Sequence, residues 1–324
     1  MFDLAALEEA TDLVRRSLPP TPTLAWPLLA ERAGCEVFVK HENHTPVGAF
    51  KVRGGLVYVD ALVREQPGVR GLVSTTRGNH GQSLAFAGRK AGLAVVIVVP
   101  RGNSVEKNAA MRALGAEVVE AGADFDEARP VAARLAAERD LQLVPSFHPT
   151  LVCGVATYAL ELFRAVADLD AVYVPIGLGS GICGVLRTRD LLGLRTRVVG
   201  VVTEGAPAYA LSLEAGRVVT TERADTFADG MACRVPDPLA LEIIRAGVER
   251  VVRVGDRAIA DAVRAYHVDS HNLAEGAGAA ALAALLQERD RMRGKRVAVV
   301  LSGGNIDRDM YARVLRDEAP VAAV

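Results

Sequence analysis

The sequence is poor in cysteine, in net charge and in long apolar runs. Its four cysteines are widely separated among 324 residues and form no C-x-x-C pair, so neither a disulfide framework nor a zinc site is expected. The formal net charge of −1 leaves no basic field that would attract nucleic acid. The longest apolar run, near Ala94–Pro100, is far too short to span a membrane, and the first residues lack the basic segment of a signal peptide. We therefore expect a cytoplasmic protein that binds no nucleic acid, no membrane and no metal.

The rest of the composition is typical of a globular protein, with 50% hydrophobic and 24% charged residues. The length allows two domains or one large one. Strands are predicted at Val37–Lys40, Gly71–Ser74, Val95–Val99, Glu117–Val119, Ala171–Pro175, Val198–Val202 and Arg296–Leu301. Helices are predicted at Gly81–Ala91, Val105–Leu114, Asp126–Arg139, Thr157–Ala167, Leu239–Gly247, Ala258–Tyr266 and Ala277–Arg289. Most of these strands are nearly continuous apolar runs between helices, which predicts an α/β fold with mostly parallel strands.

Loops of small and polar residues directly follow four of the predicted strands. They are Thr75–His80, Gly177–Gly181, Glu204-Gly205 and Ser302–Asn305. In open α/β sheets, ligands bind beyond the carboxyl ends of the strands, so these loops are expected to share a binding site. The alternating glycines of Gly177–Gly181 permit positive φ and can present backbone N–H groups to a phosphate.

Lys51 is the strongest candidate for a catalytic residue. It lies in the stretch Gly48-Ala49-Phe50-Lys51-Val52-Arg53-Gly54, between apolar neighbours. A lysine amine can form a Schiff base with an aldehyde, and an apolar setting would lower its pKa and make it a better nucleophile. Pyridoxal phosphate carries both an aldehyde and a phosphate. Lys51 and the glycine loops together therefore predict this cofactor.

Two other classes of function are open at this point. The segment Gly179–Gly184 matches the pattern G-x-G-x-x-G, and Glu204 ends a predicted strand about twenty residues further on. A dinucleotide-binding unit has this pattern, which would indicate an NAD-dependent oxidoreductase. The second alternative is an amino-acid-binding protein without catalytic activity. A visible absorption band from a lysine-bound aldehyde cofactor would distinguish a pyridoxal-phosphate enzyme from both the oxidoreductase and the non-catalytic binding protein.

Taken together, the motifs resemble the fold-type II pyridoxal-phosphate enzymes, specifically the threonine/serine dehydratase and serine racemase family. The resemblance extends from Thr21 to Asn305. It implies two open, twisted, mostly parallel sheets flanked by helices, as in the tryptophan synthase β-like fold. It also implies a large domain of residues 1–63 and 146–324, a small domain of residues 64–145, and a homodimer.

The resemblance also implies a role for each motif. Ala49–Gly54 is similar to the family's Ser-Phe-Lys-x-Arg-Gly motif, so Lys51 would carry the cofactor as a Schiff base. The loop that would bind the substrate carboxylate consists of Thr76, Arg77, Gly78, Asn79 and His80. The residues that would bind the cofactor are Phe50, Lys51, Asn79, Gly177, Leu178, Gly179, Ser180, Gly181, Glu275 and Ser302. Asn79 would bond the cofactor's 3-oxygen, and Ser302 would meet its pyridine nitrogen.

By this resemblance the chain is a dehydratase that releases a 2-oxo acid and ammonia from a β-hydroxy amino acid such as threonine or serine, and an amino-acid racemase is the alternative within the family. Arg77 stands where serine racemases place a serine that acts as second acid/base, and arginine stays protonated, which disfavours racemisation. A guanidinium at this place could pair with a second carboxylate or stack on a ring, which suggests 3-hydroxyaspartate or phenylserine. The segment Gly205–Ala210 contains no acid, so the divalent-cation site of some relatives is not expected.

Overall fold

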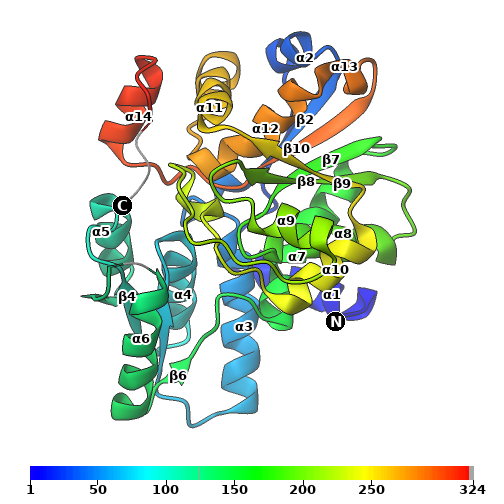
Figure 1. Ribbon diagram of the computed structural model, residues 1–324. Helices are drawn as coiled ribbons and strands as arrows, with labels where there is room; N and C mark the ends of the chain where they lie inside the picture. Colours follow the sequence, from blue (N-terminus) through cyan, green and yellow to red (C-terminus); the bar gives the residue numbers. More distant parts are fainter. Residues whose placement is uncertain (124, 321–324) are drawn as a thin grey trace. The chain divides into compact units, whose positions relative to one another are not determined.

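The computed structural model describes residues 1–123 and 125–320 and divides into two compact units. Unit 1 comprises Met1–Leu18 and Phe50–Val155, and unit 2 comprises Pro19–Ala49 and the described residues from Ala156 onward (Figure 1). This division places the first residues and the segment after Phe50 with the smaller sheet. The expected domain limits, residues 1–63 with 146–324 and residues 64–145, stay a prediction.

Unit 1 is built on a four-stranded parallel sheet in the order β5-β4-β3-β6. Its strands are β3 (Gly71–Thr75), β4 (Ala94–Val99), β5 (Glu117–Glu120) and β6 (Gln142–Leu143). Its helices are α1 (Leu4–Arg15), α3 (Lys51–Glu65), α4 (Asn79–Lys90), α5 (Val105–Ala113), α6 (Phe125–Arg139) and the first turns of α7 (Pro149–Ala165). The apolar run of β3 is buried throughout because α6 packs on one face of the sheet.

Helix α3 begins at Lys51 and was not among the predicted helices. It contains Gly54 and Gly55, which lower intrinsic helix propensity. The structure shows why glycine is needed here. A β-carbon on Gly55 would overlap the hydroxyl of Ser83 in α4, and one on Gly154 in α7 would overlap the carbonyl oxygen of Arg53. The glycines thus let α4 and α7 approach α3 closely, and this packing overrides the local propensity.

Unit 2 is built on a six-stranded sheet in the order β1-β2-β10-β7-β8-β9, in which only β1 runs antiparallel to its neighbour. Its strands are β1 (Thr23–Ala25), β2 (Glu36–His41), β7 (Ala171–Pro175), β8 (Arg197–Thr203), β9 (Arg250–Val254) and β10 (Arg296–Leu301). Its helices are α2 (Pro27–Ala33), the rest of α7, α8 (Ser180–Leu191), α9 (Ala208–Ala215), α10 (Pro238–Gly247), α11 (Asp256–Ser270), α12 (Gly276–Gln287), α13 (Arg289–Met292) and α14 (Arg308–Leu315), with 3-10 turns η1 (Glu42–His44) and η2 (Asp229–Met231).

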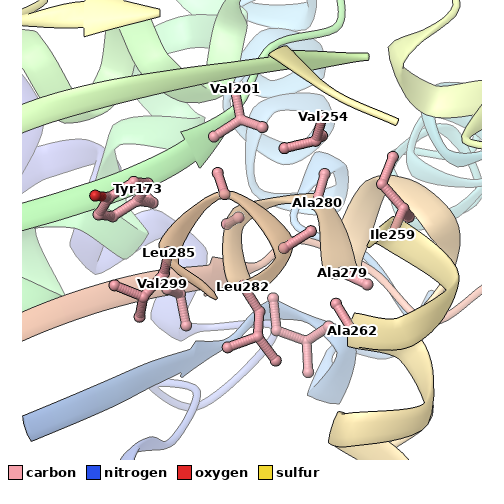
Figure 2. Close-up of a cluster of buried hydrophobic side chains, with 14 of the residues drawn as sticks. Tyr173, Val201, Val254, Ile259, Ala262, Ala279, Ala280, Leu282, Leu285 and Val299 are labelled. Atoms are coloured by element: carbon pink, nitrogen blue, oxygen red, sulfur yellow. The ribbon is translucent and has the colours of Figure 1, made fainter. Parts of the chain in front are cut away.

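The core of unit 2 forms around α12, which packs against both the sheet and α11. Figure 2 shows Ala279, Ala280, Leu282 and Leu285 of α12 among side chains from the strands and from α11. Small alanine side chains allow the helix to lie close to the apolar strands. This packing explains why α12 is apolar on nearly all sides in the sequence.

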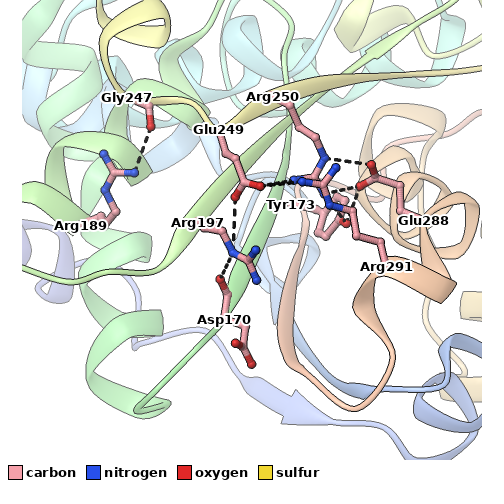
Figure 3. Close-up of polar contacts among 9 residues, drawn as sticks. All are labelled: Asp170, Tyr173, Arg189, Arg197, Gly247, Glu249, Arg250, Glu288 and Arg291. Atoms are coloured by element: carbon pink, nitrogen blue, oxygen red, sulfur yellow. Dashed lines mark hydrogen bonds and ion pairs between the residues drawn. The ribbon is translucent and has the colours of Figure 1, made fainter.

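An ion-pair network ties β7, β9 and the end of α12 together in unit 2 (Figure 3). The hydroxyl of buried Tyr173 donates to Glu288 Oε2 at 2.6 Å, and Arg250 Nε donates to Glu288 Oε1 at 2.9 Å. Arg250 also pairs with Glu249 at 2.9 Å, and Arg291 approaches the same Glu249 oxygen at 2.9 Å. The network lies where these strands begin, opposite the strand ends that carry the predicted loops.

The predicted fold class is confirmed: both sheets are mostly parallel and flanked by helices. Every predicted strand overlaps a strand of the structure, and every predicted helix overlaps a helix. The strands β1, β6 and β9 were not predicted. Of these, β1 and β6 are very short, and β9 contains two arginines that interrupt its apolar pattern. No helix within the described ranges is long and apolar enough to cross a membrane.

Candidate functional site

The amine of Lys51 is held at the start of α3 in unit 1. The Lys51 carbonyl accepts a hydrogen bond of 2.6 Å from the Ser83 hydroxyl, which fixes the first turn of α3 to α4. The Nζ atom lies 5.0 Å from the centre of the Phe50 ring, so Phe50 flanks the amine as expected. Burial lowers the pKa of Lys51 to about 8. A lowered pKa suits an amine that attacks an aldehyde, and the catalytic role of Lys51 stays a prediction.

The loop from Thr76 to His80 lies in the same unit and leads into α4. The Thr76 hydroxyl accepts from the Gly78 N–H at 3.0 Å and shapes the turn, and the helix begins with the bond from Gln82 N to Gly78 O at 3.0 Å. Gly78 is the N-cap and no side chain caps this end. A helix start presents N–H groups and the positive end of the helix dipole, which suits a carboxylate. Arg77 is half-buried in this loop.

Two buried side chains near the start of α4 have polar atoms without a hydrogen-bond partner among the described residues. They are His80 Nε2 and Gln82 Nε2. Burial and the charge of Lys51 lower the pKa of His80 to about 3, against a backbone hydrogen bond with Pro145 that raises it, so His80 is neutral. Buried polar atoms are normally paired, so these two fit a polar ligand bound beside Lys51.

Lys107 is a residue of this region that the sequence reasoning missed. It lies in α5, is buried, and its side chain passes directly over the substrate loop: a β-carbon on Gly78 would lie 2.5 Å from Lys107 Cδ. A side chain at position 78 would therefore have to displace the Lys107 side chain. Local pattern does not single out Lys107, because it follows the helix cap Ser104 in a stretch that is typical of a surface helix.

The predicted phosphate loop lies in unit 2 between β7 and α8. Gly179 is the N-cap of α8 with φ of 95°, a left-handed conformation that favours glycine, and no side chain caps the helix. The first helical bond runs from Cys183 N to Gly179 O at 3.0 Å. An α-helix leaves its first N–H groups without acceptors in the helix, and such a start binds phosphate. The loop therefore has the backbone geometry that a phosphate requires.

Close contacts connect this loop with the other predicted site segments of unit 2. A β-carbon on Gly177 would overlap the Gly230 carbonyl, and one on Gly278 would overlap the Gly303 carbonyl. The backbone N–H of Glu275 donates to the Gly303 carbonyl at 3.1 Å. The structure thus brings the phosphate loop, the segment 226–231, the start of α12 and the segment after β10 together at the carboxyl ends of the strands.

Ser302 and Glu275 both occupy this edge of unit 2 and both are buried. Ser302 follows β10 directly, and Glu275 is the N-cap residue of α12. A buried neutral hydroxyl at Ser302 suits an unprotonated pyridine nitrogen of the cofactor better than a protonated one. These two assignments, like those of the other site residues, rest on the resemblance and stay predictions.

Within unit 2, the residues that precede Phe50 in the sequence pair with the segment after β10. Ala49 forms an isolated antiparallel bridge with Gly303, and the Gly304 N–H donates to the Gly48 carbonyl at 2.9 Å. Asn305 Nδ2 donates to the Val47 carbonyl at 2.8 Å. Lys51 follows Ala49 by two residues, and each peptide link spans about 3.8 Å between Cα atoms.

No group of three or more potential metal-ligating side chains occurs in the part of the chain that the structure describes. The histidines have other contacts: His41 Nε2 accepts from Trp26 Nε1 at 2.9 Å, and His267 Nδ1 meets the Tyr311 hydroxyl at 3.0 Å. The absence of a metal cofactor stays a prediction.

Comparison with known proteins identifies the family. The model of the family described as pyridoxal-phosphate dependent enzyme matches residues 14–303. The L-threonine ammonia-lyase of Thermotoga maritima is 35% identical over 316 residues, which cover 97% of this chain and 78% of that protein. The L-threo-3-hydroxyaspartate ammonia-lyase of Saccharomyces cerevisiae is 28% identical over 95% of this chain and 94% of its own length. The solved structure of maize serine racemase superposes with a TM-score of 0.90 at 27% identity and covers 97% of each chain.

These matches confirm the predicted cofactor and the predicted class, a pyridoxal-phosphate dependent carbon–nitrogen lyase. They do not support the dinucleotide-binding alternative, because the matched residues include both Gly179–Gly184 and Glu204. The loop pattern is shared because β7, α8 and β8 form a parallel βαβ unit, which presents a glycine-rich turn to phosphates in either class. The chain belongs to the family of pyridoxal-phosphate dependent enzymes.

Proposed function

We propose that this protein is an ammonia-lyase that eliminates water from a β-hydroxy amino acid and yields a 2-oxo acid and ammonia. The observation that carries the proposal is that the buried Lys51 amine lies near the uncapped start of α4 within unit 1: its charge lowers the pKa of His80, and the Ser83 hydroxyl of α4 donates to the Lys51 carbonyl. Relatives named as ammonia-lyases for threonine and for 3-hydroxyaspartate support the same reaction class.

The family motifs indicate which residues would hold the cofactor. Lys51 Nζ would bond its aldehyde carbon, the N–H groups of Gly177–Gly181 would bind its phosphate, and the Ser302 hydroxyl would meet its ring nitrogen. When bound, pyridoxal phosphate supplies a ring system that takes up the electron pair left when the substrate Cα–H bond breaks. The uncapped α8 start and the buried Ser302 hydroxyl are the features that support this assignment.

Lys51 is also proposed to move the proton. With a pKa of about 8, about a tenth of a free amine is neutral at pH 7, which suits a general base near neutral pH. The neutral Nζ would take the Cα proton of the substrate, and the ammonium so formed would return a proton to the departing β-hydroxyl, which leaves as water. The released enamine then hydrolyses to the 2-oxo acid and ammonia. His80 is neutral and supplies a ring nitrogen for hydrogen bonding rather than a charge.

Arg77 is proposed to select the substrate. Its side chain is half-buried in the carboxylate loop, and no ion pair connects it to a carboxylate of the described residues. Its guanidinium can therefore pair with a second carboxylate of the substrate or stack on an aromatic ring. Serine and threonine offer neither group, whereas 3-hydroxyaspartate and phenylserine each offer one.

The activity is tested by incubating the holoenzyme with serine, threonine, 3-hydroxyaspartate and phenylserine and measuring ammonia and 2-oxo acid. Wild type is expected to release both products in equal amounts, and Lys51→Ala to release neither and to lose the visible absorption of the bound cofactor. Release of neither product from any of these substrates would overturn the proposal.

The substrate assignment is tested by Arg77→Ala with Arg89→Ala, an exposed arginine at the other end of α4, as a matched control. Loss of one charge-assisted interaction costs about 2 kcal/mol, which is about a 30-fold loss of kcat/KM. We expect this loss for 3-hydroxyaspartate or phenylserine and almost none for threonine. Equal losses for all substrates would show that Arg77 does not choose among them.

Racemisation is the second candidate, because maize serine racemase has the same fold over the whole chain. Arg77 argues against it, since a permanently charged guanidinium cannot return a proton to the opposite face of Cα. Optical rotation of recovered substrate measures racemisation directly, and none is expected. The homodimer and the cytoplasmic location stay predictions, and sedimentation analysis tests the first.

A further inference from the structure

Two buried tyrosines donate hydrogen bonds to backbone carbonyls of the predicted phosphate loop, Gly177–Gly181. The Tyr209 hydroxyl of α9 donates to the Leu178 carbonyl at 3.0 Å, and the Tyr158 hydroxyl of α7 donates to the Gly181 carbonyl at 3.1 Å. Both tyrosines and the whole loop belong to unit 2, and both side chains are about 1% exposed. Neither residue was singled out in the sequence, because each lies in a helix whose apolar pattern indicates only a core position.

The direction of the Tyr209 hydrogen bond is fixed by its second partner. The Asp237 N–H donates to the Tyr209 oxygen at 3.1 Å, so the single hydroxyl proton is left for the Leu178 carbonyl. Asp237 in turn caps α10 through its side chain, at 3.0 Å from the Ala240 N–H. Tyr209 is therefore held by a rigid helix start rather than by a flexible loop.

This hydrogen bond determines which way one peptide plane of the loop faces. In a trans peptide the C=O and N–H groups point in opposite directions, so fixing the Leu178 carbonyl toward Tyr209 turns the Gly179 N–H away from it. Gly179 has φ of 95°, and glycine can adopt the opposite peptide orientation at little cost. The loop's own residues therefore do not select the orientation, and Tyr209 does.

We propose that Tyr209, assisted by Tyr158, is a positioning residue that holds the loop Gly177–Gly181 with its N–H groups directed at the phosphate of the cofactor. The inference rests on the proposed phosphate site. Without Tyr209 the Leu178–Gly179 peptide populates both orientations, and phosphate binding must first select one of them. The consequence is a loss of affinity confined to ligands that carry the phosphate.

The test compares the binding of pyridoxal phosphate with that of pyridoxal, which has the same ring and aldehyde but no phosphate. The full chain freed of cofactor is titrated with each ligand, by absorbance, as wild type, Tyr209→Phe, Tyr158→Phe and Tyr266→Phe. Tyr266 is the matched control: it is fully buried in the same unit, and its hydroxyl has no hydrogen-bond partner among the described residues. A phosphorus NMR spectrum of the bound phosphate gives a second readout that does not depend on activity.

We expect Tyr209→Phe to raise the Kd of pyridoxal phosphate about tenfold and Tyr158→Phe about threefold, as for loss of one buried hydrogen bond. The Kd of pyridoxal should change less than about twofold in every variant, and the phosphorus signal should shift or broaden only in the first two. An unchanged Kd for pyridoxal phosphate in Tyr209→Phe would overturn the inference.

The same titrations separate this inference from the proposed site. Equal weakening of both ligands would assign Tyr209 a merely structural role and also overturn the inference. Equal binding of both ligands by wild type would instead show that Gly177–Gly181 does not hold the phosphate, and the proposed site itself would fail. If Tyr209→Phe does not fold, Tyr158→Phe carries the same comparison.

Discussion

Lys51 combines two properties that usually exclude each other: a position among apolar side chains and a chemistry that depends on charge. Burial stabilises the neutral amine, so the residue is prepared to attack an aldehyde before any cofactor arrives. The neighbouring His80 avoids a second buried positive charge because its own pKa falls to about 3. The Lys51 ammonium and a neutral His80 ring can share this buried region, whereas two positive charges there would repel each other.

This pKa predicts how capture of the cofactor depends on pH. The rate at which the cofactor-free protein takes up pyridoxal phosphate should be nearly constant above about pH 8 and fall about tenfold per pH unit below it, because only the neutral amine attacks. Stopped-flow absorbance measures this rate. A midpoint near the ordinary lysine value of 10.5 would contradict the assigned burial of the amine.

The sequence was sufficient to find the residues whose chemistry depends on a local pattern. The loops before α4 and α8 are marked by glycines beside predicted strand ends, and Lys51 lies in a stretch with Gly48 before it and Gly54 after it. Tyr158, Tyr209 and Lys107 could not be found in this way. Their roles depend on which distant segment each side chain meets, and a tyrosine or lysine within a helical pattern gives no indication of its partner.

At the scale of elements, the site depends on helices that begin without side-chain caps. The helices α3, α4, α8 and α12 all lack a capping side chain, whereas α1, α5 and α10 are capped by Asp3, Ser104 and Asp237. These four starts belong to the predicted site, but the missing cap is not specific to it, because α2, α9, α11, α13 and α14 also begin without a capping side chain. The starts of α4 and α12 were predicted to within two residues from their helical pattern, whereas α3 and α8, which begin beside glycines, were not among the predicted helices.

The glycine crossing of α3 and α7 makes a prediction about stability. Gly154→Ala should lower the free energy of unfolding by about 2–3 kcal/mol, because its β-carbon would overlap the Arg53 carbonyl. Gly68→Ala is the control, since a β-carbon there meets no atom within 4 Å, and it should be neutral or slightly stabilising. Urea unfolding followed by circular dichroism measures both. Equal stability of the two variants would show that the helices can separate without cost.

At the scale of the whole molecule, positive and negative charges are nearly equal in number, and many of them form ion pairs. The chain has 38 basic and 39 acidic residues. Most of its ion pairs are exposed and contribute little each. The network of Tyr173, Arg250 and Glu288 differs, because the side chains of Arg250 and Glu288 are each only 17% exposed. Its members come from strands and a helix far apart in sequence, so it could not be predicted from local pattern.

Glu288→Gln should therefore lower the thermal midpoint of unfolding by about 4 °C, which corresponds to about 2 kcal/mol for a chain of this size. The control is Asp290→Asn, which breaks an exposed pair with Arg293 and should have almost no effect. Differential scanning calorimetry of both variants measures the difference. A midpoint for Glu288→Gln equal to that of Asp290→Asn would refute the special role of the network.

The same residue predicts a contribution to acid sensitivity. Burial alone would raise the pKa of Glu288, but hydrogen bonds from Arg250 and Tyr173 outweigh it and hold the pKa below its ordinary value of 4.5. The folded state thus prefers the carboxylate, and its stabilisation is complete above pH 4.5 and lost as pH falls through the lowered pKa. Wild type should lose stability below pH 4.5 more steeply than Glu288→Gln. Parallel curves of melting temperature against pH would contradict this.

The pairing of Ala49 with Gly303 has a consequence for how this protein can change over evolutionary time. Substitutions at the exposed positions of segment 42–50, His44 and Pro46, can be absorbed as long as the backbone pairing survives. Insertion or deletion of a single residue there would shift Lys51 along the chain by one peptide unit relative to the residues that pair with Gly303. Homologues that descend from this chain should therefore differ in the sequence of that segment but not in its length.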